Sequence, residues 1–320
     1  MHTNISVIIP VYRPKNLDAL KRSIKANAAA DVEWIVVDDG SGPTFEEVLS
    51  ELEADTVMVV RLPKNGRQGA ARNQGLARAN GAWIKFLDAD DELDVGHLRS
   101  LLEVSRSSTG IAFAPTRHIY ANGTYIDNDS WVGIQSDSAA QLERMIHSPF
   151  LSHCGALFPR DLLLQIGGYD ESLVTDEDGD LLLRILQTGA HFVGIPSVRY
   201  HYHHNVGEER VSNDVGQEKL RSRIRVCEKL QQSYKNSGME IPAAVKRALA
   251  LRLDKIALSF WKNERETARH ILAQAQEISP GYISSVGPIK HFVRCAGGPG
   301  LTIAIANLFR KLRRRTPQGT

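Results

Sequence analysis

An apolar segment that ends in a cluster of acids places the strongest constraint on how this chain folds. Residues 83–87 are bulky and mostly apolar, and Asp88, Asp90 and Asp91 follow within four positions. A short run of this kind predicts a buried β-strand, and acids at its C-terminal end lie where open α/β sheets bind ligands. Asp88 and Asp90 offer hard oxygen ligands that suit Mg²⁺ or Mn²⁺ and leave positions for water and a diphosphate. A polar turn that caps the next helix would have the same residues.

The first half of the chain alternates between strand and helix patterns. Continuous apolar runs predict strands near residues 6–12, 33–37 and 56–62, in addition to 83–87. Helical spacing predicts helices near residues 17–24, 45–52 and 69–80. Strands that alternate with helices predict an α/β fold with a mostly parallel, doubly wound sheet. Right-handed crossovers then bring the ends of these strands to one edge of the sheet.

The second half is more varied and ends in helices. We expect helices near residues 93–105, 138–146, 160–166 and 178–188, strands near 110–114, 154–158, 191–195 and 197–202, and a loop or hairpin at 118–136. Beyond about residue 214 the pattern is helical only. We therefore predict an α/β domain at 1–213, a helical C-terminal region at 214–296 and a basic amphipathic tail at 297–320.

Composition excludes several classes of protein. The three cysteines, Cys154, Cys227 and Cys295, are odd in number and far apart, which does not fit a disulfide framework or a zinc site and favours a reducing, cytoplasmic compartment. A net charge of +2 does not indicate a nucleic-acid partner. The chain has no run of about 20 apolar residues and no basic, apolar leader, so we expect neither a membrane span nor a secretory signal.

Five motifs together resemble the family 2 glycosyltransferases, which have a GT-A fold. They lie at residues 7–12, 36–41, 65–75, 87–91 and 168–171, the last followed by the acidic segment 177–181, and the likeness covers about residues 4–205. The resemblance implies a Rossmann-like sheet flanked by helices. It also implies transfer of a sugar from a nucleotide diphosphate to an acceptor, with inversion and with Mn²⁺ or Mg²⁺ as cofactor.

The resemblance assigns the first three motifs to the nucleotide. Pro10, Tyr12 and Asp39 would line the base pocket, where the Asp39 carboxylate can accept a hydrogen bond from a uracil N–H; a helix N-cap is the alternative for Asp39. Asn65 and Gly66 open a helix rich in small residues, where the backbone can approach phosphate or ribose closely and anions are favoured. Arg72 would face the nucleotide, or else cover the surface of that helix.

The DxD signature and a histidine cluster are the candidate metal side. By resemblance, Asp88 contacts the ribose or the water shell of the metal, and Asp90 ligates the metal. His203 is the candidate further metal ligand from the segment 200–203. His201 and His204 are the alternatives, and a structural role would suit any of the three.

The acceptor side would come from the second half of the domain. Asp178 is the candidate catalytic base, with Asp176 and Asp180 as competitors, and we expect Asp180 to cap or pair within its helix. A merely helix-initiating role for these acids is the alternative. The residue after the base is usually aromatic in the family, but Gly179 stands here, which puts the acceptor's size and the register in question.

Three further residues could belong to the acceptor side. His153 and Cys154 lie near it by resemblance, and Trp131 could stack on a sugar face. A role in the core or in an interface suits each of them equally well.

The tail joins an apolar helical face to a cluster of positive charge. Leu301, Ile305, Leu308 and Leu312 share the face, and five basic residues lie within 310–315. This pattern is typical of a helix that binds an anionic membrane peripherally, here at the inner face of the cell membrane. A solvated tail is the alternative.

These features together predict an inverting, metal-dependent glycosyltransferase. The expected donor is a UDP-sugar, with dTDP and GDP as other options, and the expected acceptor is a saccharide or a lipid-linked saccharide. A non-catalytic nucleotide-sugar-binding protein would retain the same fold. A sugar nucleotidyltransferase would need a glycine-rich basic loop after the first strand, where residues 10–14 read Pro-Val-Tyr-Arg-Pro.

Overall fold

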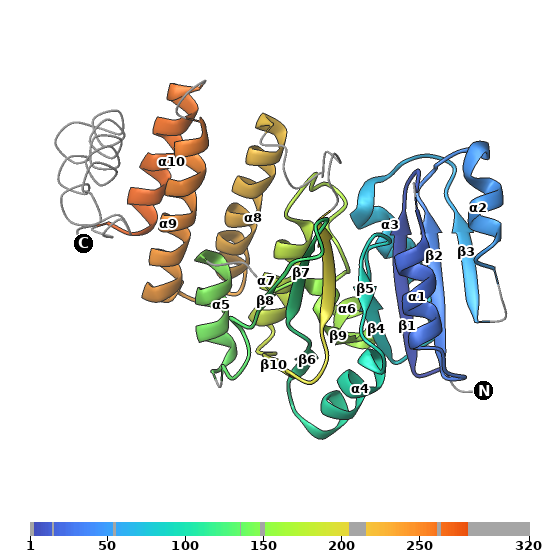
Figure 1. The fold of residues 1–320 in the computed structure, drawn as a ribbon. Coiled ribbons are helices and arrows are strands. Elements are labelled where there is room, and N and C mark those ends of the chain that lie inside the picture. The colour runs from blue at the N-terminus through green and yellow to red at the C-terminus, as the bar shows by residue number, and fades with distance from the viewer. Residues whose placement is uncertain are drawn as a thin grey trace, which may run out of the picture. The chain divides into compact units, whose positions relative to one another are not determined.

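The computed structural model describes residues 3–14, 16–53, 56–134, 136–147, 151–204, 216–260 and 264–280. Contacts within the chain define two compact units, residues 1–226 and 227–320 (Figure 1). The predicted tail at 297–320 and Cys295 lie outside the described residues.

A five-stranded sheet forms the centre of the first unit. Its order is β3 (Val57–Arg61), β2 (Val32–Asp38), β1 (Ile5–Val11), β4 (Trp83–Phe86) and β9 (Leu157–Pro159). The first four strands are parallel, and β9 runs antiparallel to β4. The mostly parallel sheet predicted from the apolar runs is therefore confirmed.

Strand β1 lies at the middle of this sheet and is buried along its whole length. Helices α1 (Asp18–Ala26), α2 (Glu46–Ser50) and α3 (Arg67–Leu76) follow β1, β2 and β3 in the chain. Helix α3 packs closely on β1 because Gly75 has no side chain, and a Cβ there would lie 2.3 Å from Ile8 Cγ2.

Two smaller sheets complete the strands of the first unit. One has the order β5 (Glu92–Leu93), β11 (Tyr200–His204), β7 (Thr116–Tyr120) and β8 (Tyr125–Asn128), and the other pairs β6 (Ile111–Phe113) with β10 (Phe192–Gly194) in parallel. Strands β7 and β8 form an antiparallel hairpin, so the hairpin is the correct alternative for residues 118–136. Strand β11 begins later than the strand expected at 197–202 because residues 196–199 form a turn.

The remaining elements of this unit carry several motif residues. They are α4 (His97–Ser107), α5 (Ser138–His147), the short 3₁₀ helix η2 (His153–Gly155), α6 (Arg160–Gln165) and α7 (Glu177–Gln187). The predicted helix at 93–105 begins late, at His97, because Glu92 and Leu93 form β5 instead. Helix α7 packs against α5 and buries most of its leucine-rich face.

Helices account for all of the described elements beyond β11. Helix α8 (Gln217–Asn236) runs across the boundary between the two units, and α9 (Ala243–Phe260) packs against α10 (Arg265–Ile278) within the second unit (Figure 1). All three lie where helical spacing predicts them. Within the described part of the chain, no helix is both long enough and apolar enough to cross a membrane.

Candidate active site

Acidic residues lie at or just beyond the C-terminal ends of the two parallel strands that flank β1. Asp38 ends β2 beside Val11 of β1, and Asp39 comes next. On the other side of β1, β4 ends at Phe86 and leads into Asp88. The topology thus brings both acidic motifs to one edge of the sheet, as the alternation of strands and helices predicts.

Asp39 fixes the loop that opens helix α3. Its buried carboxylate accepts a hydrogen bond from the Gly66 backbone N–H at 2.7 Å. Burial raises the pKa of Asp39, and the N–H groups of Gly66 and Arg67 oppose that shift. The local turn bond comes instead from Asp38, whose carboxylate accepts from the Ser41 N–H at 2.9 Å. Asp39 therefore binds its own loop to the start of α3 and does not cap the helix that follows it in the chain.

The backbones of the loops that follow β2 and β3 approach each other closely. Gly40 has a φ of +75°, and a Cβ on it would lie 2.6 Å from the carbonyl carbon of Lys64. Next to this contact, Asn65 is exposed and accepts a hydrogen bond from the Arg67 N–H at 3.2 Å. A glycine at position 40 is what allows the approach.

Pro10 and Tyr12 differ in their exposure. Pro10 is buried within β1 beside Val37, whereas the Tyr12 side chain beyond the strand is 45% exposed. The Arg13 guanidinium lies 5.0 Å from the centre of the Tyr12 ring. Of these two, only Tyr12 presents a free ring surface at this edge of the sheet.

Arg72 is buried in the middle of helix α3. Its Nη2 lies 2.7 Å from Asp88 Oδ1 and 3.1 Å from Gln68 Oε1, and its Nη1 lies 3.2 Å from Glu177 Oε1. The guanidinium also lies 5.3 Å from the centre of the Tyr169 ring. With 1% of its side chain exposed, Arg72 does not cover the helix surface. It joins α3, the end of β4 and the start of α7.

Asp88 is held as an anion by its surroundings. Burial by itself would raise its pKa, but the charges of Arg72 and His153 and the hydrogen bond from Arg72 bring the pKa below its ordinary value. A carboxylate paired in this way is a fixed negative charge and hydrogen-bond acceptor at the sheet edge.

Asp91 is a structural residue whose role the sequence did not indicate. Its fully buried carboxyl group accepts hydrogen bonds from the Tyr200 hydroxyl and from the His203 N–H, the latter at 3.0 Å. Burial, with the nearby charges of Asp90 and Asp88, raises its pKa well above the ordinary value. Asp91 thereby attaches β11 to the end of β4 and sets His203 beside the acidic motif.

The three histidines of β11 have different environments. His203 Nε2 lies 3.5 Å from Glu92 Oε2, and His201 Nε2 lies 2.9 Å from Asp94 Oδ1. His204 stacks on the Tyr120 ring at 4.5 Å and belongs to the opposite face of the strand. Burial lowers the pKa of His203, while the charges of Glu92 and Asp90 act the other way. The structure thus brings His203 near half-buried Asp90, and its assignment as a metal ligand stays a prediction.

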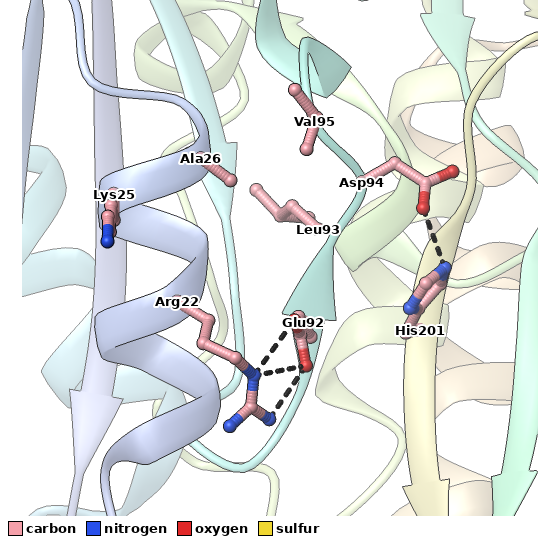
Figure 2. A pocket seen from close by; sticks show the side chains of 8 residues that line it. All are labelled: Arg22, Lys25, Ala26, Glu92, Leu93, Asp94, Val95 and His201. Carbon is pink, nitrogen blue, oxygen red and sulfur yellow. Dashed lines mark hydrogen bonds and ion pairs between the residues drawn. The ribbon is translucent and has the colours of Figure 1, made fainter.

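His201 lines a surface hollow of about 450 Å³ that lies between α1, β5 and β11 (Figure 2). The residues around it are Arg22, Lys25, Ala26, Glu92, Leu93, Asp94, Val95 and His201. Arg22 binds Glu92 with two nitrogens across this hollow, at 2.8 Å for the shortest contact. The ion pairs Arg22–Glu92 and His201–Asp94 engage four of its lining residues, and Glu92 also lies 3.5 Å from His203 Nε2.

Asp178 lies in the first turn of α7 with its side chain 46% exposed. Its Oδ1 accepts a hydrogen bond from the Gly179 N–H at 2.9 Å, and its Oδ2 lies 3.7 Å from His153 Nδ1. Burial opposes ionisation, but His153, Arg72 and the Gly179 N–H together lower the pKa of Asp178 far below the ordinary value. Asp178 is therefore an ionised carboxylate whose side chain is partly exposed to solvent.

The neighbouring acids have other surroundings. Asp180 is buried and bound by Arg184 at 2.8 Å, so it pairs within its helix as predicted. Asp176 precedes the helix with a φ of +64°. A Cβ at Gly179 would lie 2.4 Å from Asp176 Oδ1, so the Asp176 carboxylate takes up space that a side chain at 179 would need. Gly179, where the family usually has an aromatic residue, therefore leaves the space that the Asp176 carboxylate fills.

Asn73 holds the segment that leads to α7 against α3. Its Oδ1 accepts from the Tyr169 N–H at 2.8 Å, and its Nδ2 donates to the Tyr169 carbonyl at 2.9 Å and to Glu171 Oε1 at 2.8 Å. Gly168 has a φ of +66°, and a Cβ there would lie 2.5 Å from Asn73 Oδ1. Arg72 and Asn73, which are adjacent in the chain, therefore connect helix α3 to the segment from Tyr169 to Glu177. The spacing of the motifs in the sequence did not reveal this connection.

One group of donors is close enough together to hold an ion within the described residues. The donor atoms of Asp88, His153 and Cys154 lie within 4.8 Å of one another. Burial raises the pKa of the Cys154 thiol well above its ordinary value, and a protonated thiol does not ligate metals. We therefore do not assign a metal to this group.

Trp131 is buried under the Arg144 guanidinium, at 5.2 Å, which favours a core role for it.

The chain is similar to several known proteins. The model of "Glycosyl transferase family 2" matches residues 6–167. Similar proteins include a Campylobacter jejuni GalNAc(5)-diNAcBac-PP-undecaprenol beta-1,3-glucosyltransferase, 30% identical over 50% of this chain and 52% of the relative. They also include the succinoglycan biosynthesis protein ExoO of Rhizobium meliloti, 25% identical over 74% of this chain and 70% of the relative. The chain spans only 20% to 52% of the length of the relatives that head this comparison.

The fold is similar to that of a solved structure. Staphylococcus aureus TarS in complex with UDP-GlcNAc superposes with a TM-score of 0.71 at 17% identity, over 97% of this chain and 92% of that one. The likeness extends over the α/β sheet and the C-terminal helices. Because the family model covers half of the chain and the fold agrees, this protein belongs to glycosyl transferase family 2.

Proposed function

We propose that this protein transfers a sugar from a UDP-sugar to a saccharide or a lipid-linked saccharide, with inversion at the anomeric carbon. The observation that carries the proposal is the half-exposed, ionised Asp178 carboxylate at the start of α7. It is joined through Arg72 and Glu177 to the strand-end acid Asp88. The names of the Campylobacter and Rhizobium relatives support a saccharide acceptor.

The nucleotide would bind at the edge formed by the ends of β1, β2 and β4. Tyr12 offers an exposed ring for the base, and the Asp39 carboxylate has one oxygen bound to Gly66 and a second that can accept from uracil. Pro10, Asn65 and Gly66 shape the loops on either side. Asp88, oriented by Arg72, would accept from a ribose hydroxyl.

The residues near the diphosphate position fit a divalent ion. Asp90 supplies a carboxylate, and burial lowers the pKa of His203, which favours the neutral imidazole that can ligate. Asp88 is engaged by Arg72, so Asp90 and His203 are the two residues that would hold Mn²⁺ or Mg²⁺. Such an ion, when bound, neutralises charge on a departing diphosphate.

The reaction itself would be a single displacement. Asp178 accepts the proton of the acceptor hydroxyl, whose oxygen attacks the anomeric carbon while the bond to the diphosphate oxygen breaks on the opposite face. UDP leaves with the electrons of that bond, and the new glycosidic bond has inverted configuration. A general base contributes about 10²- to 10⁴-fold to such a rate.

UDP release from a panel of nucleotide sugars tests this function. The assay should be run with a mixed saccharide acceptor, with Mn²⁺, with Mg²⁺ and with excess EDTA, and the product's anomeric configuration should be read by NMR. We expect release of one nucleotide, loss of turnover in EDTA and inversion. Binding without release would indicate a non-catalytic nucleotide-sugar-binding protein, and full turnover in EDTA or by Asp90→Ala would refute the metal's role.

We also propose that residues 1–213 form the catalytic domain and that residues 214–296 form a helical region. We further propose that residues 297–320 bind the cytoplasmic face of an anionic membrane. The support is the sequence pattern, because the tail lies outside the described residues. Each basic residue near an anionic surface contributes about 1 kcal/mol. Vesicle flotation should be lost on truncation before Gly300 and weakened by salt. Flotation that survives the truncation would contradict the proposal.

A further inference from the structure

His153 lies in a rigid position beside the proposed base. It begins η2, and its ring packs near the rings of Phe86 and Tyr169, at 6.0 Å and 6.1 Å between centres. The next residue is fixed at both ends of its backbone: the Cys154 N–H donates to Ser152 Oγ at 3.2 Å, and the Cys154 carbonyl accepts from buried Lys85. The ring therefore has little freedom to turn.

The two nitrogens of this ring face different groups. Nδ1 is buried, has no hydrogen-bond partner and lies 3.7 Å from Asp178 Oδ2. Nε2 lies 3.3 Å from Cys154 Sγ. Hydrogen bonds at catalytic groups are often long before substrate binds and shorten in the complex. The 3.7 Å between Nδ1 and Asp178 Oδ2 therefore suits a hydrogen bond that forms when the acceptor binds.

The thiol decides which nitrogen carries the hydrogen. Burial raises the pKa of Cys154, so the sulfur keeps its proton and can donate it to Nε2. When Nε2 accepts from the thiol, the ring N–H on Nδ1 is directed toward Asp178. This order of groups, thiol to imidazole to carboxylate, follows from the contacts on each side of the ring.

We propose that His153 is a positioning residue for Asp178, and that Cys154 fixes its tautomer. The His153 Nδ1–H holds Oδ2 of the carboxylate while the Gly179 N–H holds Oδ1, so the remaining lone pairs point to one place for the acceptor hydroxyl. The inference rests on the proposed function of Asp178 as the base. The other charged groups near Asp178 are Arg72, Glu177 and Asp88; His153 also acts on the carboxylates of Glu177 and Asp88, and a carboxylate oxygen of Asp88 lies within 4.8 Å of one of its nitrogens.

Paired substitutions separate positioning from packing. The amide nitrogen of Asn can replace Nδ1 of a histidine, whereas that of Gln replaces Nε2. We expect His153→Asn to retain a rate near that of the wild type and His153→Gln to lower kcat by about tenfold to 100-fold, the range for a hydrogen bond to a charged group. The KM for the donor should be unchanged in both. Equal rates for the two variants, or a change in donor KM alone, would overturn the inference.

The tautomer is tested at Cys154. Cys154→Ser keeps a donor toward Nε2 and should retain the rate, whereas Cys154→Ala removes it and should lower kcat. Cys227→Ala, at the other described buried cysteine, is the matched control for the loss of a buried thiol and should leave kcat unchanged. Equal kcat for Cys154→Ser and Cys154→Ala would refute the role of the thiol even if the histidine variants misfold.

A measurement without any sugar separates this inference from the proposed function. The Asp178 carboxyl can be titrated by ¹³C NMR and assigned by its absence in Asp178→Asn. We expect its pKa to rise in His153→Gln and to stay low in His153→Asn. If the pKa rises but the wild-type protein transfers no sugar, the positioning holds and the proposed function fails. If the protein transfers sugar but neither the pKa nor the rate responds to His153→Gln, the inference alone is wrong.

Discussion

The guanidinium of Arg72 and the carboxylate of Asp88 form an ion pair at 2.7 Å that joins helix α3 to the end of strand β4. Arg72 is buried, and its second nitrogen reaches Glu177 at the start of α7. One side chain therefore connects the motifs that we propose for the nucleotide with the motif that we propose for the acceptor. Several consequences of this connection can be measured.

Replacement of Arg72 should destabilise the domain strongly. Arg72→Met leaves the carboxylates of Asp88 and Glu177 without their cation, and removal of one partner of a buried ion pair costs about 3–5 kcal/mol. Arg72→Lys should also be destabilising because a lysine cannot reproduce the forked contacts. Urea unfolding measures both. The control is Arg78→Met, an exposed arginine just after α3 that contacts only Gln74; a loss as large as that of Arg72→Met would contradict the assignment.

Asp91 should matter for stability through its two hydrogen bonds. Asp91→Asn can still accept from the His203 N–H and can donate to the Tyr200 oxygen, so we expect a small change in the free energy of unfolding. Asp91→Leu leaves both partners buried and unpaired, at about 1–3 kcal/mol for each group. Because the folded pKa of Asp91 is raised, its contribution is largest at low pH and declines as the pH rises above the usual aspartate range. Equal stability of the two variants would argue against these contacts.

Lys85 should give the protein a measurable dependence on alkaline pH. Its amino group is buried beside His97 Nε2, at 2.9 Å, and burial lowers its pKa from 10.5 to about 7. Between these values the unfolded chain holds a proton that the folded state does not, so stability rises with pH in that window. The difference in unfolding free energy between wild type and Lys85→Met should increase by at most about 1.4 kcal/mol per pH unit from pH 7 upward. A difference independent of pH would show that the amine titrates normally.

The sequence predicted the elements whose apolar residues form a continuous run or a helical spacing. Strands β1, β2, β3 and β4 form from runs of apolar residues, and the hydrophobic spacing of α9 and α10 was sufficient to place them. The short strand β5 and the late start of α4 were missed, because a two-residue strand has no period of its own. The antiparallel β9 was found as a strand, but its partner β4 lies more than 70 residues earlier in the chain.

Candidate site residues can be picked from the sequence where the residue type itself indicates a chemistry. Asp39, Asp88, Asp90 and Asp178 stand out as acids at strand and helix ends. Asp91 did not, because its partners Tyr200 and His203 lie more than 100 residues later in the chain. In the sequence, Lys85 is a charged residue that interrupts an apolar run. Only the fold shows that its amino group is buried beside the Cys154 carbonyl. Such roles depend on tertiary contacts that spacing does not encode.

The central claim is that Asp178 is the catalytic base, and the Asp178→Asn variant tests it most directly. The substitution keeps the size of the side chain and removes its ability to accept a proton, so kcat should fall by about 10²- to 10⁴-fold. Donor binding, measured by calorimetry with UDP, should remain near that of the wild type because the residue faces the acceptor.

Asp176→Asn and Asp180→Asn are the matched controls for this measurement. Asp180 is bound by Arg184 within its helix, so its variant should lose stability and retain much of the rate at a temperature where it is folded. The decisive quantity is kcat for the three variants under saturating donor and acceptor. A loss confined to Asp178→Asn is the result that we predict; normal turnover by Asp178→Asn, with the loss at Asp176 or Asp180 instead, would contradict the account.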